Sequence, residues 1–342
     1  MATLHRRSLL VLAPAALVAA CGQKMRTTVS TTPKLDIDGL NTDIGKLAET
    51  ASPGALGVGL TNLESGESFT FNGERRFPMQ SVFKMLLGAA ALAEVDAGRL
   101  RLDEAIELRE EQLSARYSPI AEAWPTRRDY TMGELLAGAV TDSDNTAADV
   151  LMKRIGGPGA VTAWLVGKHV TELRVDRYER ELQPEAYGLP SFRPAWRFGP
   201  AYAAAFEAVP PATRMAAMRA YLADPRDTAT PRGTVDFLSA LDRGELISAA
   251  STRRLLELMN QTTRGGARIR AGLPKDAFLA HKPGTGGGDQ GISLAHNDVG
   301  IFRLADRRAY AIAVFLSGST LSEPARDALI ADVTRAAVRG VR

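Results

Sequence analysis

The chain has 342 residues, of which 45% are hydrophobic and 24% charged, a composition typical of a globular protein rather than a disordered or fibrous one. Lys and Arg number 42 against 39 Asp and Glu, with no basic stripe, so no nucleic-acid partner is expected. The single cysteine excludes an intramolecular disulfide and a cysteine-ligated metal site, and the four histidines are scattered. We therefore expect no metal and no cofactor.

Residues 1–20 predict an export signal. Arg6 and Arg7 precede the apolar run 9–20, which is too short to span a bilayer and is typical of a secretory signal peptide. The basic start also resembles a twin-arginine signal. The run ends in Ala19-Ala20-Cys21-Gly22, which resembles the lipobox of bacterial lipoproteins, where the cysteine carries lipid and becomes the mature N-terminus.

Lipidation of Cys21 would make residues 21–37 a tether at the periplasmic face of a bacterial membrane. The alternative is a plain signal peptide with an incidental cysteine. We expect a monomer that contacts the membrane only through this lipid.

The segment after the tether predicts a helix followed by a β-hairpin. Apolar residues between 35 and 47 recur at helical spacing. Two strand-like runs, 57–61 and 68–72, then flank the polar turn 64–67. From about residue 82 to 155 the pattern is predominantly helical.

Towards the C-terminus, the sequence predicts strands over 277–281, 291–295 and 310–316 and a helix over 323–338. The run 310–316 is continuously apolar and is expected to be central. Strands at both ends of the chain predict an α/β fold of the α+β type, in which an antiparallel sheet flanked by terminal helices is assembled from both ends of the chain and an all-helical domain is inserted in the middle. The sheet domain is expected over 38–81 and 232–342, and the helical domain over 82–231.

Ser81 and Lys84 lie three residues apart at the start of a predicted helix, which brings an amine to a hydroxyl on the same face. A serine is a weak nucleophile unless a neighbouring base accepts its proton, and the N-terminal end of a helix favours the anion that develops. Because this spacing also arises by chance, the pair alone favours a capped helix with a surface lysine unless further motifs agree.

Three further motifs follow in order, and with Ser81 and Lys84 they resemble the class A serine β-lactamases of the penicillin-binding-protein/β-lactamase superfamily. Ser143-Asp144-Asn145 resembles the Ser-Asp-Asn loop of that family. Glu179, in a segment that ends Leu182-Gln183, resembles the Glu-x-x-Leu-Asn segment of its omega loop. Lys282-Pro283-Gly284-Thr285 follows a predicted strand and resembles its Lys-Thr-Gly element. The likeness runs from about residue 38 to 340, and it implies an active site between the sheet and the inserted helical domain.

The resemblance implies a β-lactam hydrolase that works through a serine acyl-enzyme and confers β-lactam resistance. Ser81 would attack the lactam carbonyl, and either Lys84 or Glu179 acting through a water would accept its proton; the choice stays open. The backbone N–H groups of Ser81 and Thr285 would form the oxyanion hole. Ser143 would pass a proton to the lactam nitrogen, and Glu179 would activate the deacylating water.

The resemblance also implies a set of substrate-binding residues. Asn145 would hold the acylamide side chain, Tyr117 would form an apolar wall, and Lys282 would favour the substrate carboxylate. Pro283 removes the hydroxyl that ordinarily helps to bind this carboxylate, and Arg268 resembles the arginine that takes over the task in some relatives. The alternative for Arg268 is a surface arginine.

Gln183 stands where the family usually has asparagine, and its extra methylene can misplace the deacylating water. Together with Pro283, this departure leaves a second function open: a penicillin-binding protein or D-alanyl-D-alanine carboxypeptidase-like lipoprotein that deacylates slowly. A third possibility is an envelope lipoprotein that keeps the fold without catalysis.

Arg177 and Asp227 resemble the pair that clasps the omega loop, but they lie 50 positions apart, which is long for such a loop. The surplus at about 187–222 predicts a short helical hairpin. Two interpretations stay open for this insertion: an element packed on the outside, or a flap that shapes the mouth of the cleft.

Overall fold

The computed structural model describes residues 34–114 and 117–341. The predicted signal peptide, Cys21 and most of the predicted tether lie outside the described residues. Within them, no helix combines the length and the apolar character needed to cross a membrane.

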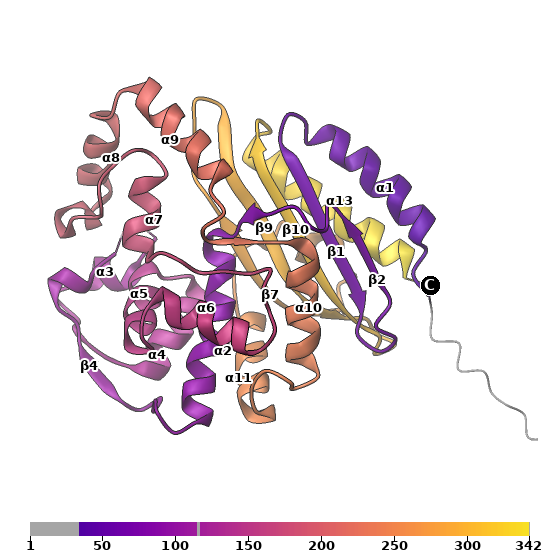
Figure 1. Cartoon of the computed structure of the whole chain (residues 1–342), viewed down its shortest axis with the longest axis horizontal. Helices are drawn as coiled ribbons and strands as arrows, with labels where there is room; N and C mark the ends of the chain where they lie inside the picture. Colours follow the sequence, from indigo (N-terminus) through magenta and orange to yellow (C-terminus); the bar gives the residue numbers. More distant parts are fainter. Residues whose placement is uncertain (1–33, 115–116, 342) are drawn as a thin grey trace, which may run out of the picture. The chain divides into compact units, whose positions relative to one another are not determined.

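An antiparallel sheet built from both ends of this region forms the centre of the fold (Figure 1). Its strands run in the order β2-β1-β10-β9-β7, and the short β8 pairs with β9. The apolar strand β10 is central and almost fully buried, as its sequence predicts. The strands are β1 (Ala55–Asn62), β2 (Ser68–Phe71), β7 (Phe278–Thr285), β8 (Gly288–Asp289), β9 (Ile292–Arg303) and β10 (Ala309–Ser319).

Two terminal helices, α1 (Ile37–Thr50) and α13 (Glu323–Gly340), pack together against one face of the sheet (Figure 1). Asp36 caps α1 by accepting a hydrogen bond from the backbone of Gly39 (3.1 Å), which satisfies one of the free N–H groups of the first turn. Leu40 and Ile44, one turn apart, turn the buried face of α1 towards the core.

On the opposite face, α10 (Pro231–Asp242) contacts β1 and β10, and α11 (Ala249–Asn260) contacts β7 and α2 (Phe83–Asp96). Ten consecutive residues of α2, from Phe83 to Leu92, are buried, so this helix is enclosed on all sides. The turn before α2 contacts β7 and β9, and α2 itself packs against a helical region, so the start of α2 lies between the sheet and that region. That region contains α3 (Pro119–Ala123), α4 (Met132–Ala137), α5 (Asn145–Arg154), α6 (Pro158–Gly167) and α7 (Glu179–Glu185).

Short elements complete the described chain. The single turns are η1 (Gln80–Val82), η2 (Glu110–Gln112), η3 (Gly138–Asp142), η4 (Pro194–Arg197) and α12 (Ile269–Gly272). Two small ribbons pair β3 (Phe77–Pro78) with β6 (Thr228–Ala229) and β4 (Ala105–Glu107) with β5 (Asp129–Thr131).

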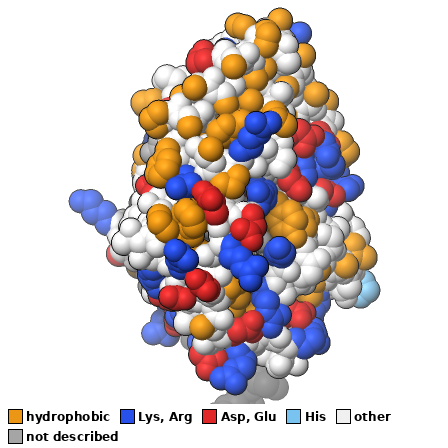
Figure 2. Space-filling view, turned by 90° about the vertical axis from the view of Figure 1, so that its left-hand side faces the viewer, with side chains coloured by type: hydrophobic (Ala, Val, Ile, Leu, Met, Phe, Trp, Pro, Cys, Tyr) orange, Lys and Arg blue, Asp and Glu red, His pale blue; other side chains and the backbone are white. Residues whose placement is uncertain are grey.

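The segment at 187–222 forms two helices, α8 (Gly199–Glu207) and α9 (Pro211–Ala223). Met218 and Tyr221 of α9 pack with Leu182 of α7 and Leu294 of β9 in a small core of their own. By contrast, no residue of α8 is buried. Figure 2 shows charges of both signs intermingled over much of one face, with hydrophobic side chains gathered towards the top, where Figure 1 places α8 and α9.

Candidate active site

A cleft of about 540 Å³ lies beside the edge strand β7 and contains the half-buried Ser81. Of the sequence-predicted site residues, six others line it: Tyr117, Ser143, Asn145, Gln183, Arg268 and Thr285. The structure therefore brings together residues from helices, loops and a strand that are up to about two hundred positions apart in the chain.

The backbone at Ser81 is held from two sides. The amide of Asn297 on β9 donates to the carbonyls of Pro78 (2.9 Å) and Met79 (3.1 Å), which ties the segment before Ser81 to the sheet. Gly284 of β7 passes so close that a Cβ there would lie 2.4 Å from the carbonyl oxygen of Met79. Glycine at this position thus lets the strand approach the serine.

Lys84 is fully buried and connects the motifs of Ser143 and Glu179 to that of Ser81. Its Nζ donates to the carbonyl of Ser143 (2.8 Å) and to Oδ1 of Asn145 (2.5 Å). It also forms an ion pair with Oε1 of Glu179 at 3.0 Å, and neither side chain is exposed to solvent. A buried ammonium paired with a buried carboxylate provides a base and a positive charge at one point, one helical turn from Ser81.

The loop that carries Ser143 is shaped by η3 before it and by Asp144 after it. Ser143 adopts a left-handed conformation (φ 63°) directly after η3. Asp144 then caps α5 by accepting from the backbone of Ala147 (2.9 Å), and it also accepts from the backbone of Ile120 (2.8 Å). This arrangement places Asn145 in the first turn of α5 and turns Ser143 towards β7.

Lys282 on β7 donates to Oγ of Ser143 at 2.9 Å. The side chain is fully buried, and burial, reinforced by the positive charge of Lys84, lowers the pKa of Lys282 well below its usual range. Lys282 therefore donates a hydrogen bond to the Ser143 hydroxyl from a site where the lysine ammonium loses its proton more readily than in water.

Glu179 begins α7, and its position is set by Asp149 of α5. Asp149 accepts from the backbone N–H groups of Glu179 (2.7 Å) and Arg180 (3.0 Å). Burial raises the pKa of Asp149 to about 7, and the adjacent Glu179 carboxylate adds to this effect. On the other side, Nε2 of Gln183 donates to Oε2 of Glu179 at 2.8 Å.

Arg268 is buried rather than lying on the surface. Its guanidinium donates to Oγ1 of Thr285 (2.7 Å), to the carbonyl of Asn297 (2.9 Å) and to Oδ1 of Asp327 (2.9 Å). These contacts hold a planar cation at the end of β7, where Pro283 provides no hydroxyl.

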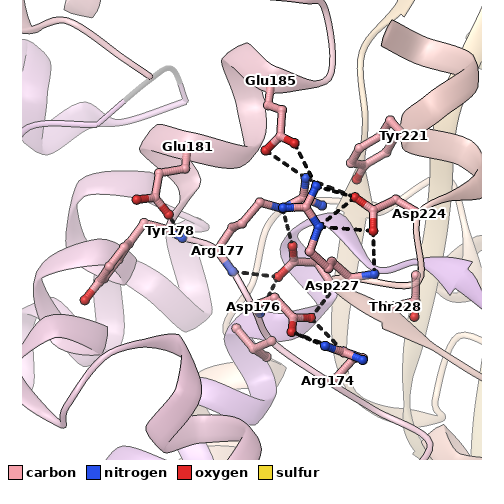
Figure 3. A network of polar contacts seen from close by, with 12 residues as sticks. Arg174, Asp176, Arg177, Tyr178, Glu181, Glu185, Tyr221, Asp224, Asp227 and Thr228 are labelled. Atoms are coloured by element: carbon pink, nitrogen blue, oxygen red, sulfur yellow. Dashed lines mark hydrogen bonds and ion pairs between the residues drawn. The ribbon is translucent and has the colours of Figure 1, made fainter. Parts of the chain in front are cut away.

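The predicted clasp is closed although its two residues are 50 positions apart (Figure 3). Nε of Arg177 lies 2.6 Å from Oδ2 of Asp227, and Nη1 of Arg177 contacts Glu185 (3.0 Å) and Asp224 (3.4 Å). Arg226 bridges the same two carboxylates at 2.7 and 2.6 Å. Hence the ends of the extended loop are joined by a network of charges rather than by one pair.

Sequence reasoning missed several residues that help to build the cleft. The guanidinium of Arg264 stacks on the exposed ring of Tyr117 at 3.7 Å. Tyr187, at the start of the insertion, and Tyr202 on α8 also line the cleft. Aromatic residues at the start of an insertion were the available signal for the two tyrosines, but nothing in their spacing indicates which way they face.

Comparisons with known proteins test the resemblance found in the sequence. A family model described as the beta-lactamase enzyme family matches residues 39–341. Beta-lactamase VEB-1 from Pseudomonas aeruginosa is 28% identical over 281 residues, which cover 82% of this chain and 83% of that protein.

Solved structures give the same result. The class A β-lactamase of the last common ancestor of Gram-negative bacteria is 34% identical with a TM-score of 0.73, covering 89% of this chain and 100% of that one. A β-lactamase from Chitinophaga pinensis is 32% identical with a TM-score of 0.71, covering 87% and 97%. The chain belongs to the beta-lactamase enzyme family, as a serine β-lactamase of class A. The family and the antiparallel α/β fold predicted from the sequence are thereby confirmed.

Proposed function

We propose that this chain hydrolyses β-lactams through an acyl-enzyme on Ser81 that a water activated by Glu179 then releases. The observation that carries the proposal is the buried Glu179, which pairs with Lys84 (3.0 Å) and accepts from the half-buried Gln183 (2.8 Å) beside the cleft that holds Ser81. A carboxylate fixed in this way can accept a proton from a water in the cleft.

In acylation, Oγ of Ser81 forms a bond to the lactam carbonyl carbon while Lys84, or Glu179 through a water, accepts its proton. The backbone N–H groups of Ser81 and Thr285 stabilise the oxyanion. The carbon–nitrogen bond of the ring then breaks, and the hydroxyl of Ser143, which accepts from Lys282 at 2.9 Å, gives its proton to the departing nitrogen. In deacylation, the water adds to the ester carbon, Glu179 accepts its proton, and Ser81 leaves with a proton restored.

Residues that line the same cleft bind the substrate. The guanidinium of Arg268, fixed on Thr285 at 2.7 Å, binds the carboxylate that the substrate carries. Asn145 holds the acylamide group, and the ring of Tyr117 with Arg264 stacked on it closes one side of the cleft.

Turnover of a chromogenic cephalosporin by the full chain, together with intact mass after mixing with a penicillin, tests this proposal. We expect continuous turnover by the wild type and none by Ser81→Ala, in which no acyl adduct can form. A stoichiometric adduct that persists on the wild type would instead support a penicillin-binding protein or a carboxypeptidase-like protein. Pro283, which lines the cleft where a hydroxyl is usual in the family, is the observation that favours this second candidate.

We further propose that the chain is exported, is held at the periplasmic face of a bacterial membrane by lipid on Cys21, and acts as a monomer. The lipobox-like sequence before Cys21 supports the anchor. The mass of the mature N-terminus tests it, with Cys21→Ala as the variant expected to release the enzyme from the membrane fraction. An unmodified N-terminus elsewhere in the chain would contradict the anchor without affecting the catalytic proposal.

A further inference from the structure

One buried tyrosine of the insertion reaches towards the deacylation machinery. Tyr221 on α9 is 5% exposed, and its hydroxyl oxygen lies 2.6 Å from Nε2 of Gln80. Gln80 directly precedes Ser81, is itself 1% exposed, and adopts a left-handed conformation (φ 47°) that is costly for a non-glycine residue. The insertion is thus bonded to the residue next to the nucleophile.

The hydrogen bonds continue from Gln80 to Glu179. Oε1 of Gln80 accepts from Nε2 of Gln183 at 2.9 Å, and the same nitrogen donates to Oε2 of Glu179 at 2.8 Å. A carboxylate only accepts, so Gln183 has to present its NH₂ group to Glu179, and the second hydrogen of that group has to find an acceptor. Gln80 supplies this acceptor only while its own NH₂ group points the other way, at the oxygen of Tyr221.

The other side of Tyr221 faces the clasp of the omega loop. Its ring lies 5.8 Å from the guanidinium carbon of Arg177, and Figure 3 shows it beside Asp224, which follows α9 in the chain. Arg177 is in turn bound to Asp227, Glu185 and Asp224. The clasp therefore fixes the end of α9, and with it the place of the tyrosine hydroxyl.

We propose that Tyr221 is a positioning residue for deacylation, which through Gln80 holds the Gln183 amide in the one orientation that donates to Glu179. The inference rests on the proposed function, because it assigns a role within the deacylation step. It also gives a reason why the long side chain of Gln183 serves in the place of the usual asparagine. Besides its bond to Glu179, Gln183 donates a hydrogen bond to Gln80, which a shorter asparagine side chain has less reach to make. The insertion supplies the last acceptor of this chain of hydrogen bonds, the hydroxyl of Tyr221.

The test is Tyr221→Phe in the full chain, which keeps the ring and its packing and removes only the acceptor. Without the tyrosine hydroxyl, the buried Nε2 of Gln80 loses its acceptor, and the Gln80 amide is no longer held in one orientation. We expect the deacylation rate to fall about tenfold, as for a small displacement of a catalytic group, while the rate of adduct formation stays within about twofold. The two rates are separated by single-turnover mass measurements with a penicillin.

The control is Tyr310→Phe, which removes another buried hydroxyl, bonded to Arg308 at 3.4 Å in the core beneath the terminal helices. We expect both of its rates to match the wild type. A general loss of packing in Tyr221→Phe would slow both steps together and would overturn the proposal, as would an unchanged deacylation rate.

A double-mutant cycle with Gln80→Met sharpens the test. Met has a side chain of similar length and no amide, so this variant removes the link between Tyr221 and Gln183. We expect Gln80→Met alone to slow deacylation and Tyr221→Phe to add nothing in its background. Additive losses would overturn the proposal, because they would mean that Tyr221 does not act through Gln80. If the wild type itself gives a stable adduct without turnover, the proposed function fails and this inference with it. If the wild type turns over and Tyr221→Phe does so equally fast, only the inference fails.

Discussion

The two sides of the cleft are built in different ways. On one side, Ser81, Lys84 and Lys282 stand on η1, α2 and β7, and Ser143 lies in the turn between η3 and α5. These elements are built into the main core or the sheet. On the other side, Glu179 stands on the short helix α7, within an extended loop that charged groups close. The elements that carry the acylating groups are therefore held mainly by packing, and the loop that carries the deacylating group is closed by hydrogen bonds and ion pairs.

Single substitutions should disturb the loop side of the cleft more easily than the packed side. A packed core resists local change because many apolar contacts act together. By contrast, removing one partner of a buried ion pair leaves the other charge buried and unpaired, which is strongly destabilising. We expect substitutions on the loop side to slow the release of the acyl group more than its formation.

Glu179→Gln should have the largest effect. The amide keeps the shape of the side chain but cannot accept a proton, so the deacylation rate should fall by roughly a thousandfold. If Lys84 can serve as the base, acylation should persist and the acyl-enzyme should accumulate, as intact mass would show after mixing with a penicillin. Loss of adduct formation as well would mean that Glu179 also acts in acylation, and the two sides of the cleft would then not be separable.

Asp227→Asn should open the clasp. This change leaves Arg177 without its nearest carboxylate in a buried position, at a cost to the free energy of unfolding of about 3 kcal/mol. Chemical denaturation measures that cost, and single-turnover kinetics should show deacylation slowed by about tenfold with less effect on acylation. The matched control is Arg226→Gln, which breaks the more exposed bonds to Glu185 and Asp224 and should cost less than about 1 kcal/mol.

The same comparison explains what the sequence could predict. The strand β10 was predictable as central because its apolar run is continuous, and Ser81, Lys84 and Ser143 lie in short motifs whose spacing is local. Arg268 was predictable only through its resemblance to a family arginine, and the structure adds its contacts with Thr285 and Asp327.

The loop side was harder to predict because its contacts join residues far apart in the chain. Gln80 and Tyr221 are 141 positions apart, and neither belongs to a motif. Asp149 sits in the middle of α5, where its sequence neighbours give no sign that it accepts from the backbone of Glu179. Long-range hydrogen bonds of this kind leave no periodic pattern, so only the folded structure reveals them.

Asp149 gives a prediction on pH. Its pKa is raised from 3.8 to about 7 in the folded protein, so between these values the folded state binds more protons than the unfolded state. The contribution of Asp149 to stability is therefore complete below about pH 4 and is lost as the pH rises to about 7, with a slope of at most about 1.4 kcal/mol per pH unit. Asp149→Asn should flatten this part of the stability profile, measured by denaturation at several pH values. An unchanged profile would mean that another group titrates there.

Tyr202 tests whether the insertion only packs on the outside or also shapes the cleft. It lines the cleft from α8, its ring packs edge-on against Trp196 at 6.1 Å, and burial raises its pKa to about 12. Because aromatic rings attract one another, Tyr202→Ala should lower kcat/KM about fivefold for β-lactams with an aromatic acylamide group relative to those with a small one. The control is Phe198→Ala, which removes a half-exposed ring just before α8. If both variants leave the ranking of substrates unchanged, the insertion acts on catalysis only from the side of Tyr221, and α8 serves as outer packing.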